Sequence, residues 1–469
     1  MHGDTSINSR NCKSASKNQS FMTHKTAITP DTVRQTLGRH MLADGFDMVL
    51  DLVKSQGPYL HDSNGNRTYL DFFTFFASNP MGMNHPKMVE NEAFLEKIGR
   101  VALHNPSNSD AYTVEMAEFV ETFSRVGIPE SMPKAFFVAG GGLAVENALK
   151  TAFDWKVQKN FQKGYRKEKG HMVLHFDEAF HGRTGYTMSL TNTDPTKVAY
   201  FPKFDWPRIS NPKMVFPMDQ QNTEQVVEAE KKAIAQAECY FEMYKDDIAA
   251  IIIEPIQGEG GDNHFRPEFH QALRDLADRH EALLIHDEVQ TGVGLTGKFW
   301  AHEHYVQPDI LAFGKKAQVC GILANNRIDD VDTNVFKVSS RINSTWGGNL
   351  VDMVRFTRYL EIIEEDGLVD NAAKTGSYLL EHLGKLTGEF DHINNVRGRG
   401  LMCAFDFPNA EMRAHFLKSA FNHGLLMLPC GTHSVRFRPP LTVQEEHIDE
   451  GMDIIRKSIV ESWDQVPRT

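Results

Sequence analysis

Short runs of apolar residues alternate with stretches of helical periodicity through the central part of the chain. The apolar runs lie at residues 135–138, 172–176, 248–254, 282–285 and 310–313, and each predicts a strand. Helical spacing is found at residues 143–156 and 267–280, the second with Pro267 in its first turn. The run at 248–254 is almost entirely apolar, which is typical of a strand buried on both faces. Strands alternating with helices predict an α/β fold, with a large, mostly parallel sheet covered by helices on both faces.

The pattern changes after about residue 350. Amphipathic stretches at 352–365 and 372–388 predict long helices, and short strands are expected near 401–407 and 434–437. Thr442, with Glu445 three residues later, predicts a capping box at the start of the last helix. These elements indicate a smaller α+β domain. We therefore expect four parts: a disordered tail (1–25), an N-terminal segment that packs with the small domain (26–75), a large domain (76–350) and the C-terminal small domain (351–469).

Composition and charge narrow the class of protein. The 469 residues carry a formal net charge of −12, which disfavours wholesale nucleic-acid binding but leaves room for a local basic patch. No apolar run approaches the roughly 18 residues that a membrane span requires. The five cysteines form neither a Cys-x-x-Cys pair nor a zinc spacing. We therefore expect no metal site, and a reducing, cytoplasmic location.

The first 25 residues are rich in Ser, Asn, Lys and Thr and lack the apolar core of a secretory signal. A disordered tail is the favoured interpretation. Two alternatives stay open. The segment could be a mitochondrial presequence, because its basic residues outnumber the single acid, Asp4, or the native chain could start at Met22.

Candidate functional residues follow the ends of the predicted strands, which is where ligands bind in parallel α/β sheets. Gly140, Gly141 and Gly142 open a helix whose free N–H groups suit a phosphate, although such a run is often a plain turn. Lys315 and Lys316 follow the strand at 310–313. Two solvated lysines are the ordinary interpretation, because a lysine is rarely buried unless it is neutralised or paired.

Three further strand ends carry candidate groups. Phe180 suits stacking on a flat ring and Arg183 suits binding of a carboxylate, but a core phenylalanine and an arginine paired with a neighbouring acid would give the same pattern. Glu259 stands among glycines, which favours either a carboxylate that moves or a plain polar loop. Asp287 comes just after an apolar strand, so its carboxylate needs a buried partner such as a protonated ring nitrogen.

Together these groups describe a site for pyridoxal 5′-phosphate. They supply a phosphate cradle, a stacking ring, a buried aspartate and a lysine at the end of a strand. The cofactor's aldehyde condenses with a lysine amine, and an aspartate keeps the pyridine nitrogen protonated so that the ring withdraws electrons. Such a site would explain a lysine at the edge of the core.

The motifs, taken in order, resemble those of the class III aminotransferases. They are the glycine turn, Phe-His-Gly-Arg at 180–183, Glu-Pro-x-x-Gly-Glu-Gly at 254–260, Asp-Glu-Val-Gln-Thr-Gly at 287–292, and Pro-Asp-Ile followed by Gly-Lys at 308–315. The resemblance spans roughly residues 57–445. It implies the pyridoxal-phosphate-dependent transferase fold type I, which is the aspartate-aminotransferase-like fold.

One departure from the class points to a subgroup. Most of the class follows its lysine with glycines, whereas this chain continues with Lys-Ala-Gln-Val-Cys-Gly. In this respect the sequence resembles the subgroup that transfers the ε-amino group of L-lysine. The same subgroup is indicated by Phe-Phe-Ala-Ser at 75–78, Asn-Ser-Thr-Trp-Gly-Gly-Asn at 343–349 and Val-Arg-Phe-Arg-Pro-Pro-Leu at 435–441.

The resemblance implies a role for each matching residue. For the cofactor, Lys315 bonds the aldehyde, Asp287 pairs with the ring nitrogen, Gln290 lies near the ring hydroxyl, Phe180 stacks on the ring, Gly141 and Gly142 bind the phosphate, and Thr345 reaches the phosphate of the other subunit of a homodimer. Lys315 and Asp287 are thereby the expected catalytic residues. For the substrate, Arg183 binds the α-carboxylate of L-lysine, with Asn343 of the partner subunit as a weaker candidate.

Glu259 and Arg436 match a gate pair of ω-aminotransferases, with Arg438 as the competing arginine. The implied reaction moves the ε-amino group of L-lysine to 2-oxoglutarate in a ping-pong sequence, giving 2-aminoadipate 6-semialdehyde and L-glutamate. Ornithine aminotransferase, 4-aminobutyrate aminotransferase and a relative that moves an amino group within one molecule are alternatives, since one methylene gives only ~10- to 200-fold discrimination. A cofactor-free binding protein is a further alternative, which the presence of Lys315 and Asp287 disfavours.

Overall fold

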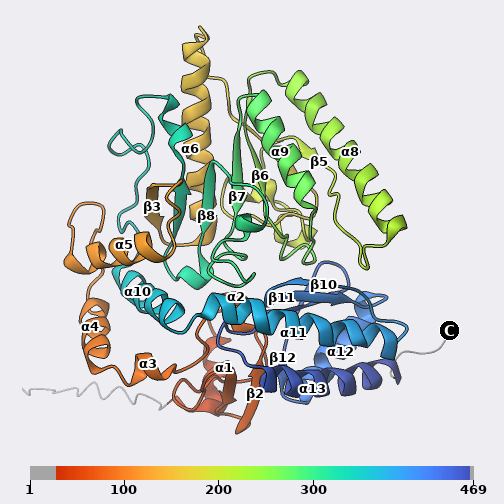
Figure 1. Ribbon diagram of the computed structural model, residues 1–469. Helices are drawn as coiled ribbons and strands as arrows, with labels where there is room; N and C mark the ends of the chain where they lie inside the picture. The colour runs from red at the N-terminus through yellow and green to blue at the C-terminus, as the bar shows by residue number, and fades with distance from the viewer. Residues whose placement is uncertain (1–27, 465–469) are drawn as a thin grey trace, which may run out of the picture.

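The computed structural model describes residues 28–464, so the expected tail at 1–25 and the alternative start at Met22 lie outside the described residues. A seven-stranded sheet lies at the centre of the larger part of the molecule (Figure 1), in the order β3-β9-β8-β7-β6-β4-β5. Its strands are β3 (Lys134–Val138), β4 (Met172–Phe176), β5 (Arg208–Ile209), β6 (Ile248–Ile253), β7 (Leu283–Asp287), β8 (Ile310–Phe313) and β9 (Cys320–Ala324).

The sheet is mostly parallel, as the sequence predicts. Strands β5, β4, β6, β7 and β8 pair in parallel, whereas β9 runs antiparallel to both of its neighbours. All six residues of β6 are buried, which confirms that this strand is covered on both faces. Strand β9 is not predicted from the sequence, because its apolar residues follow the Lys315–Lys316 turn without a separate turn signal.

Helices cover both faces of this sheet (Figure 1). The long ones are α6 (Gly141–Gln162), α8 (Gln220–Met243) and α9 (Pro267–Arg279). Val145, Leu149 and Trp155 of α6 pack on one face of the sheet, in a core cluster with residues of β6, β7 and β8. Helices α8 and α9 pack on the other face. The predicted helix at 143–156 is therefore confirmed but is longer than expected at both ends.

The C-terminal part contains an antiparallel sheet in the order β10-β11-β14-β13, together with helices. The strands are β10 (Asn394–Arg399), β11 (Met402–Asp406), β13 (Leu428–Cys430) and β14 (Ser434–Phe437). The helices are α10 (Leu350–Glu365), α11 (Leu368–Glu389), α12 (Ala410–Asn422) and α13 (Glu445–Asp464). The predicted smaller α+β unit is thus present.

The predicted capping box at the last helix is wrong. Helix α13 begins at Glu445, three residues after Thr442, so Thr442 lies too far ahead to cap its first turn. The Thr442 hydroxyl instead donates to the Met81 carbonyl oxygen at 3.3 Å. The N-cap position falls on Gln444, whose N–H donates to His447 Nδ1 at 3.1 Å. The threonine therefore ties the chain before α13 to an N-terminal segment.

Residues near the N-terminus also pair with the C-terminal part. A three-stranded sheet joins β1 (Tyr59–Asp62), β2 (Arg67–Asp71) and β12 (Leu425–Leu426) in the order β1-β2-β12. The remaining α-helices are α1 (Val33–Leu37), α2 (Thr74–Ala77), α3 (Pro86–Val89), α4 (Glu92–Ala102), α5 (Val114–Val126) and α7 (Thr187–Leu190). Over residues 28–464, no helix combines the length and apolar character that crossing a membrane would require.

The α2 segment is a left-handed turn built without glycine. Its four residues have φ angles from 40° to 63°. Such a backbone costs roughly 1–2 kcal/mol per residue, so other contacts must hold it. Asp71 Oδ1 accepts from the Thr74 N–H at 2.7 Å, and the Thr74 hydroxyl donates to the Arg438 carbonyl oxygen at 2.6 Å. The turn is therefore fixed by a residue just before it and by one more than 360 positions away.

Candidate active site

The carboxyl ends of β4, β6, β7 and β8 and the start of α6 surround one cavity of about 230 Å³. It is lined by Gly141, Gly142, Phe180, His181, Gly182, Glu254, Asp287, Val289, Gln290 and Lys315. All six residues that the sequence analysis places around the cofactor ring and at the phosphate of the same subunit are among them. A second cavity of about 570 Å³ shares Lys315 with the first.

The two adjacent lysines face different surroundings. Lys315 lines both cavities, and burial lowers the pKa of its amine to about 8, with the charge of Arg436 acting in the same direction. Lys316 is fully buried and donates to the Gln290 carbonyl oxygen at 2.6 Å and to the Ala77 carbonyl oxygen at 3.4 Å. Its burial lowers the pKa of the amine well below the ordinary value. Lys315 is therefore the reactive candidate, and Lys316 ties two loops together.

Asp287 is held by a buried histidine. His181 Nδ1 lies 2.8 Å from Asp287 Oδ2, and the Val289 N–H donates to Asp287 Oδ1 at 3.1 Å. Both side chains in the His181–Asp287 pair are almost completely buried. This role of His181 is not predicted from the sequence, although the position of His181 next to Phe180 at the end of a strand is a signal for one.

Glu254 is a second buried carboxyl at the cavity. Its Oε1 accepts from the Phe180 N–H at 2.9 Å, and its Oε2 accepts from the Gly258 N–H at 3.0 Å. Burial, aided by the charge of Asp287, raises the pKa of Glu254 to about 7. Glu254 thus fixes the loops that follow β4 and β6. It is the first residue of the Glu-Pro motif, but that motif alone does not reveal the role.

Glu259 lies between two cations. Arg436 Nη2 donates to Glu259 Oε2 at 2.9 Å, and Lys197 Nζ donates to Glu259 Oε1 at 2.6 Å. Burial alone would raise the pKa of Glu259, but the charges of Arg436 and Lys197 lower it below the ordinary value. Arg436 is 2% exposed, and its Nε is buried without a partner among the described residues. That N–H is a donor that no described residue uses.

Arg438, the competing arginine, does not contact Glu259. It forms a two-point ion pair with Asp262, at 2.8 Å and 2.5 Å, and both side chains are fully buried. The same guanidinium donates to Gln290 Oε1 at 2.7 Å and 3.1 Å. Arg438 therefore orients the amide of Gln290 at the wall of the cavity.

None of the five residues expected to bind the substrate or the phosphate of the other subunit lines this cavity, and Glu259 and Arg436 are among the five. Arg183, Asn343 and Thr345 are all exposed, and none lines it. Asn343 and Thr345 belong to a segment tied down by Ser109, whose hydroxyl donates to the Ser344 carbonyl oxygen at 2.5 Å. The segment is held in place by the chain, while its Asn343 and Thr345 side chains are open to a second molecule.

The residues at the cavity fit pyridoxal phosphate. Helix α6 begins at Gly141, so its first N–H groups lack partners within the helix and suit an anion. A side chain at Gly141 would come within 2.9 Å of Val289 Cγ1, so this helix start stays bare. Asp287 offers a buried acceptor for a protonated ring nitrogen, and Lys315 offers an amine with a lowered pKa. Together they provide the three kinds of group that such a cofactor needs.

The chain belongs to the class III aminotransferases, whose family model matches residues 41–459. Enzymes of this class depend on pyridoxal phosphate.

Within the class, the chain is 52% identical to an L-lysine-epsilon aminotransferase of Mycobacterium bovis, over 92% of this chain and 96% of that one. It is 51% identical to the enzyme of that name from Amycolatopsis lactamdurans, over 91% of this chain and 95% of the other. The solved structure of a lysine aminotransferase from Mycobacterium tuberculosis is similar with a TM-score of 0.91 and 52% identity, covering 93% of this chain and all of that one. A mitochondrial 4-aminobutyrate aminotransferase of Mus musculus is 33% identical, over 84% of this chain and 81% of its own length.

Proposed function

We propose that this protein transfers the ε-amino group of L-lysine to 2-oxoglutarate, with 2-aminoadipate 6-semialdehyde and L-glutamate as products. The main support for this proposal is the Glu259–Arg436 pair, because such a pair would let one site accept first the ε-amino end of L-lysine and then a dicarboxylic acid. The identity to L-lysine-epsilon aminotransferases, well above that to the 4-aminobutyrate enzymes, supports L-lysine over the alternative amines.

In this proposal different cavity residues hold different parts of the cofactor. Gly141 and Gly142 would bind the phosphate, Phe180 would stack on the ring, Gln290 would lie near the ring hydroxyl and Asp287 would hold the ring nitrogen protonated. When bound, pyridoxal phosphate supplies an aldehyde that receives the amino group and a ring that withdraws electrons from the neighbouring carbon. Asp287 is kept in place by His181, which acts as a positioning residue.

Lys315 is the proposed base. A pKa of about 8 leaves a useful fraction of its amine neutral near neutral pH, so Lys315 Nζ can accept a proton from the ε-carbon of the substrate. Arg183 would bind the α-carboxylate of L-lysine, assisted by Asn343 of the partner subunit.

Glu259 would cover Arg436 while L-lysine reacts, because no carboxylate then lies near the ring. It would leave Arg436 when 2-oxoglutarate or glutamate arrives. A carboxylate on the ligand could then accept from Nη2 and from the unpartnered Nε of Arg436.

A homodimer is part of the proposal. The segment with Asn343 and Thr345 carries the exposed ring of Trp346, and the neighbouring segment exposes Leu103 and Tyr112. The two segments are joined by a hydrogen bond from the Asn108 N–H to the Trp346 carbonyl oxygen at 3.2 Å. Exposed large apolar side chains on two joined segments favour an interface, which would bring Thr345 to the phosphate of the other subunit. Light scattering during size-exclusion chromatography measures the mass.

We also propose a cytoplasmic location. The four cysteines among residues 28–464 are free thiols, and three of them are buried, which favours a reducing compartment.

The test of the reaction is a half-reaction followed by absorbance. The purified holoenzyme receives L-lysine without any keto acid, and L-ornithine and 4-aminobutyrate are added in parallel samples. The visible band of the bound cofactor should bleach fastest with L-lysine and should return when 2-oxoglutarate is added. Bleaching by another amine but not by L-lysine would remove the lysine assignment. A protein that takes up no added cofactor would remove the enzymatic proposal.

A further inference from the structure

Lys197 is a charged residue beside the proposed Glu259–Arg436 gate, and the reaction as described above does not use it. It ends a short 3-10 helix, η2 (Pro195–Lys197), which is capped by the Asp194 side chain. Its ammonium lies 2.6 Å from Glu259 Oε1 and 5.5 Å from the centre of the Phe180 ring. It therefore binds the opposite carboxylate oxygen from the one that Arg436 binds, and it is about a quarter exposed.

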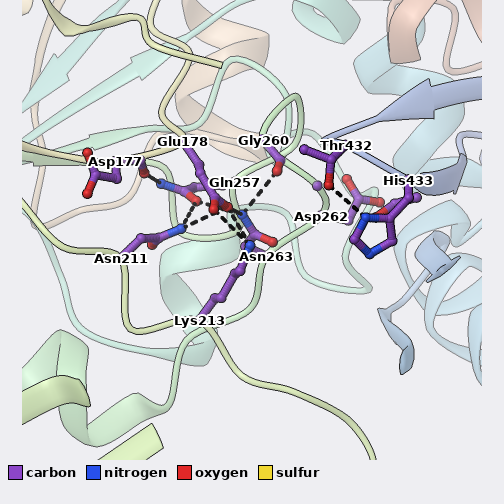
Figure 2. Close-up of polar contacts among 12 residues, drawn as sticks. Asp177, Glu178, Asn211, Lys213, Gln257, Gly260, Asp262, Asn263, Thr432 and His433 are labelled. Carbon is purple, nitrogen blue, oxygen red and sulfur yellow. Dashed lines mark hydrogen bonds and ion pairs between the residues drawn. The ribbon is translucent and has the colours of Figure 1, made fainter. Parts of the chain in front are cut away.

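The loop that carries Glu259 is held at both ends. Gln257 and Asn263 exchange two backbone hydrogen bonds at 3.0 Å, which close the loop between them. Figure 2 shows the side chains that anchor it: the Gln257 amide donates to the Asp177 carbonyl oxygen at 3.0 Å, and the Asn263 amide donates to Gln257 Oε1 at 2.9 Å.

The same network continues to the strand-end loop after β4. Asn263 Nδ2 also donates to Glu178 Oε2 at 2.8 Å, and Lys213 forms an ion pair with Glu178 (Figure 2). A side chain at Gly260 would lie 2.0 Å from the Glu178 carbonyl oxygen, so the two loops are in close contact. With its backbone fixed in this way, Glu259 must leave Arg436 by rotating its side chain.

The charges around Glu259 are unbalanced. Two cations, Lys197 and Arg436, share one carboxylate. Arrival of a ligand carboxylate at Arg436 would give two cations and two carboxylates, which can form two separate ion pairs. Glu259 would then still have a cationic partner, so its charge would not be left unpaired in a partly buried site.

We propose that Lys197 is a positioning residue for the gate, which retains the Glu259 carboxylate when Arg436 turns to a dicarboxylic substrate. This inference rests on the proposed function and adds to it a residue that favours the dicarboxylate half of the cycle. Without Lys197, separation of Glu259 from Arg436 would leave an unpaired carboxylate, so the closed arrangement would be favoured. The L-lysine half of the cycle uses the closed arrangement and does not require Lys197.

The experiment compares the two halves of the cycle in Lys197→Met, Lys197→Arg and Lys203→Met holoenzymes. Lys203 is the matched control because it lies in the same part of the chain but donates to the carbonyl oxygens of Val198 and Phe201 rather than to a carboxylate. Stopped-flow absorbance gives the second-order rate constants for L-lysine and for 2-oxoglutarate. Calorimetry gives the Kd of glutarate, a dicarboxylate that carries no amino or keto group to react.

In Lys197→Met, the constant for 2-oxoglutarate should fall and the Kd of glutarate should rise, each about tenfold, as is typical of coupled sites. The second-order rate constant for L-lysine should stay within about twofold of its value in the unaltered protein. A change below this size would mean that Lys197 is only weakly coupled to the L-lysine half of the cycle. Lys197→Arg should keep most of the dicarboxylate binding, and Lys203→Met should match the unaltered protein. In a Glu259→Ala background, Lys197→Met should have no further effect on glutarate.

Equal falls in the rate constants for L-lysine and for 2-oxoglutarate would overturn the inference, because they would mean that Lys197 affects cofactor binding through Phe180. A loss confined to L-lysine would overturn it too, since Lys197 would then bind that substrate. An unchanged Kd of glutarate would also overturn it. Failure of the unaltered protein to react with L-lysine is a different result: it removes the lysine assignment, while the glutarate measurements still decide the role of Lys197.

Discussion

Replacing Arg436 by methionine separates the two half-reactions more sharply than any other single change we foresee. Methionine keeps much of the length of the side chain but removes every N–H. A dicarboxylate bound to Arg436 would gain two charge-assisted hydrogen bonds, from Nε and Nη2, at about 1.5–3 kcal/mol each. Breaking the Arg436–Glu259 ion pair offsets about 1–2 kcal/mol of this gain, since that ion pair is only partly buried.

The net loss is then about 1–5 kcal/mol, which corresponds to a ~5- to ~4,000-fold fall in the second-order rate constant for 2-oxoglutarate. The constant for L-lysine should change by less than about threefold, because Arg436 is covered by Glu259 in that half of the cycle. Single-turnover absorbance measurements on Arg436→Met holoenzyme give both constants. Parallel losses for the two substrates would refute the reasoning, and so would a variant that keeps its reactivity with 2-oxoglutarate.

Three other changes test separate parts of the site. Lys315→Ala should lower turnover by at least ~1,000-fold while the circular dichroism spectrum is unchanged, because the proposed base is lost; substantial remaining turnover would contradict the assignment. Arg438→Met should lower the free energy of unfolding in urea by about 3–5 kcal/mol, because Asp262 is left buried and unpaired, and an unchanged midpoint would contradict this. Burial raises the pKa of Asp71 to about 6, so the protonated carboxyl favours the folded state below pH ~4, and this contribution is lost as the pH rises through 6. The free energy of unfolding of Asp71→Asn, relative to that of the unaltered protein, should therefore rise by about 3 kcal/mol between pH ~4 and pH ~8. If urea titrations give the same difference between the two proteins at both pH values, this prediction is wrong.

The sequence predicts the main sheet and the place of the cavity because both follow from local patterns. Apolar runs mark the strands, and in a parallel sheet their carboxyl ends meet at one edge. Gly141, Phe180, Asp287 and Lys315 could therefore be expected to meet before any coordinates were known, and they do line one cavity. The resemblance to the class III aminotransferases added the roles, which spacing alone does not give.

The contacts that the sequence does not predict depend on tertiary packing. Lys197 lies in an irregular stretch with no periodicity, and nothing near it in the chain points to Glu259, 62 positions away. Arg436 and Arg438 are two arginines only two positions apart. The sequence does not tell them apart, and the fold pairs the first with Glu259 and the second with Asp262. The capping box fails for a similar reason, since a long-range contact with Met81 uses the Thr442 hydroxyl.

The left-handed turn at Thr74–Ala77 also bears on the order in which the chain folds. The local hydrogen bonds of residues 74–77, including the one to Asp71, do not by themselves offset a backbone cost of roughly 1–2 kcal/mol per residue, so the turn is unstable until its distant partners have arrived. One partner, the Arg438 carbonyl oxygen, lies 364 positions later in the chain, and another, Lys316, is adjacent to the residue proposed as the base. During synthesis, the turn must therefore wait until nearly the whole chain has emerged. Nascent or truncated chains that lack residue 438 should leave the wall that Phe75 gives to the second cavity unformed, so the reactive amine of Lys315 would gain its finished surroundings late in folding.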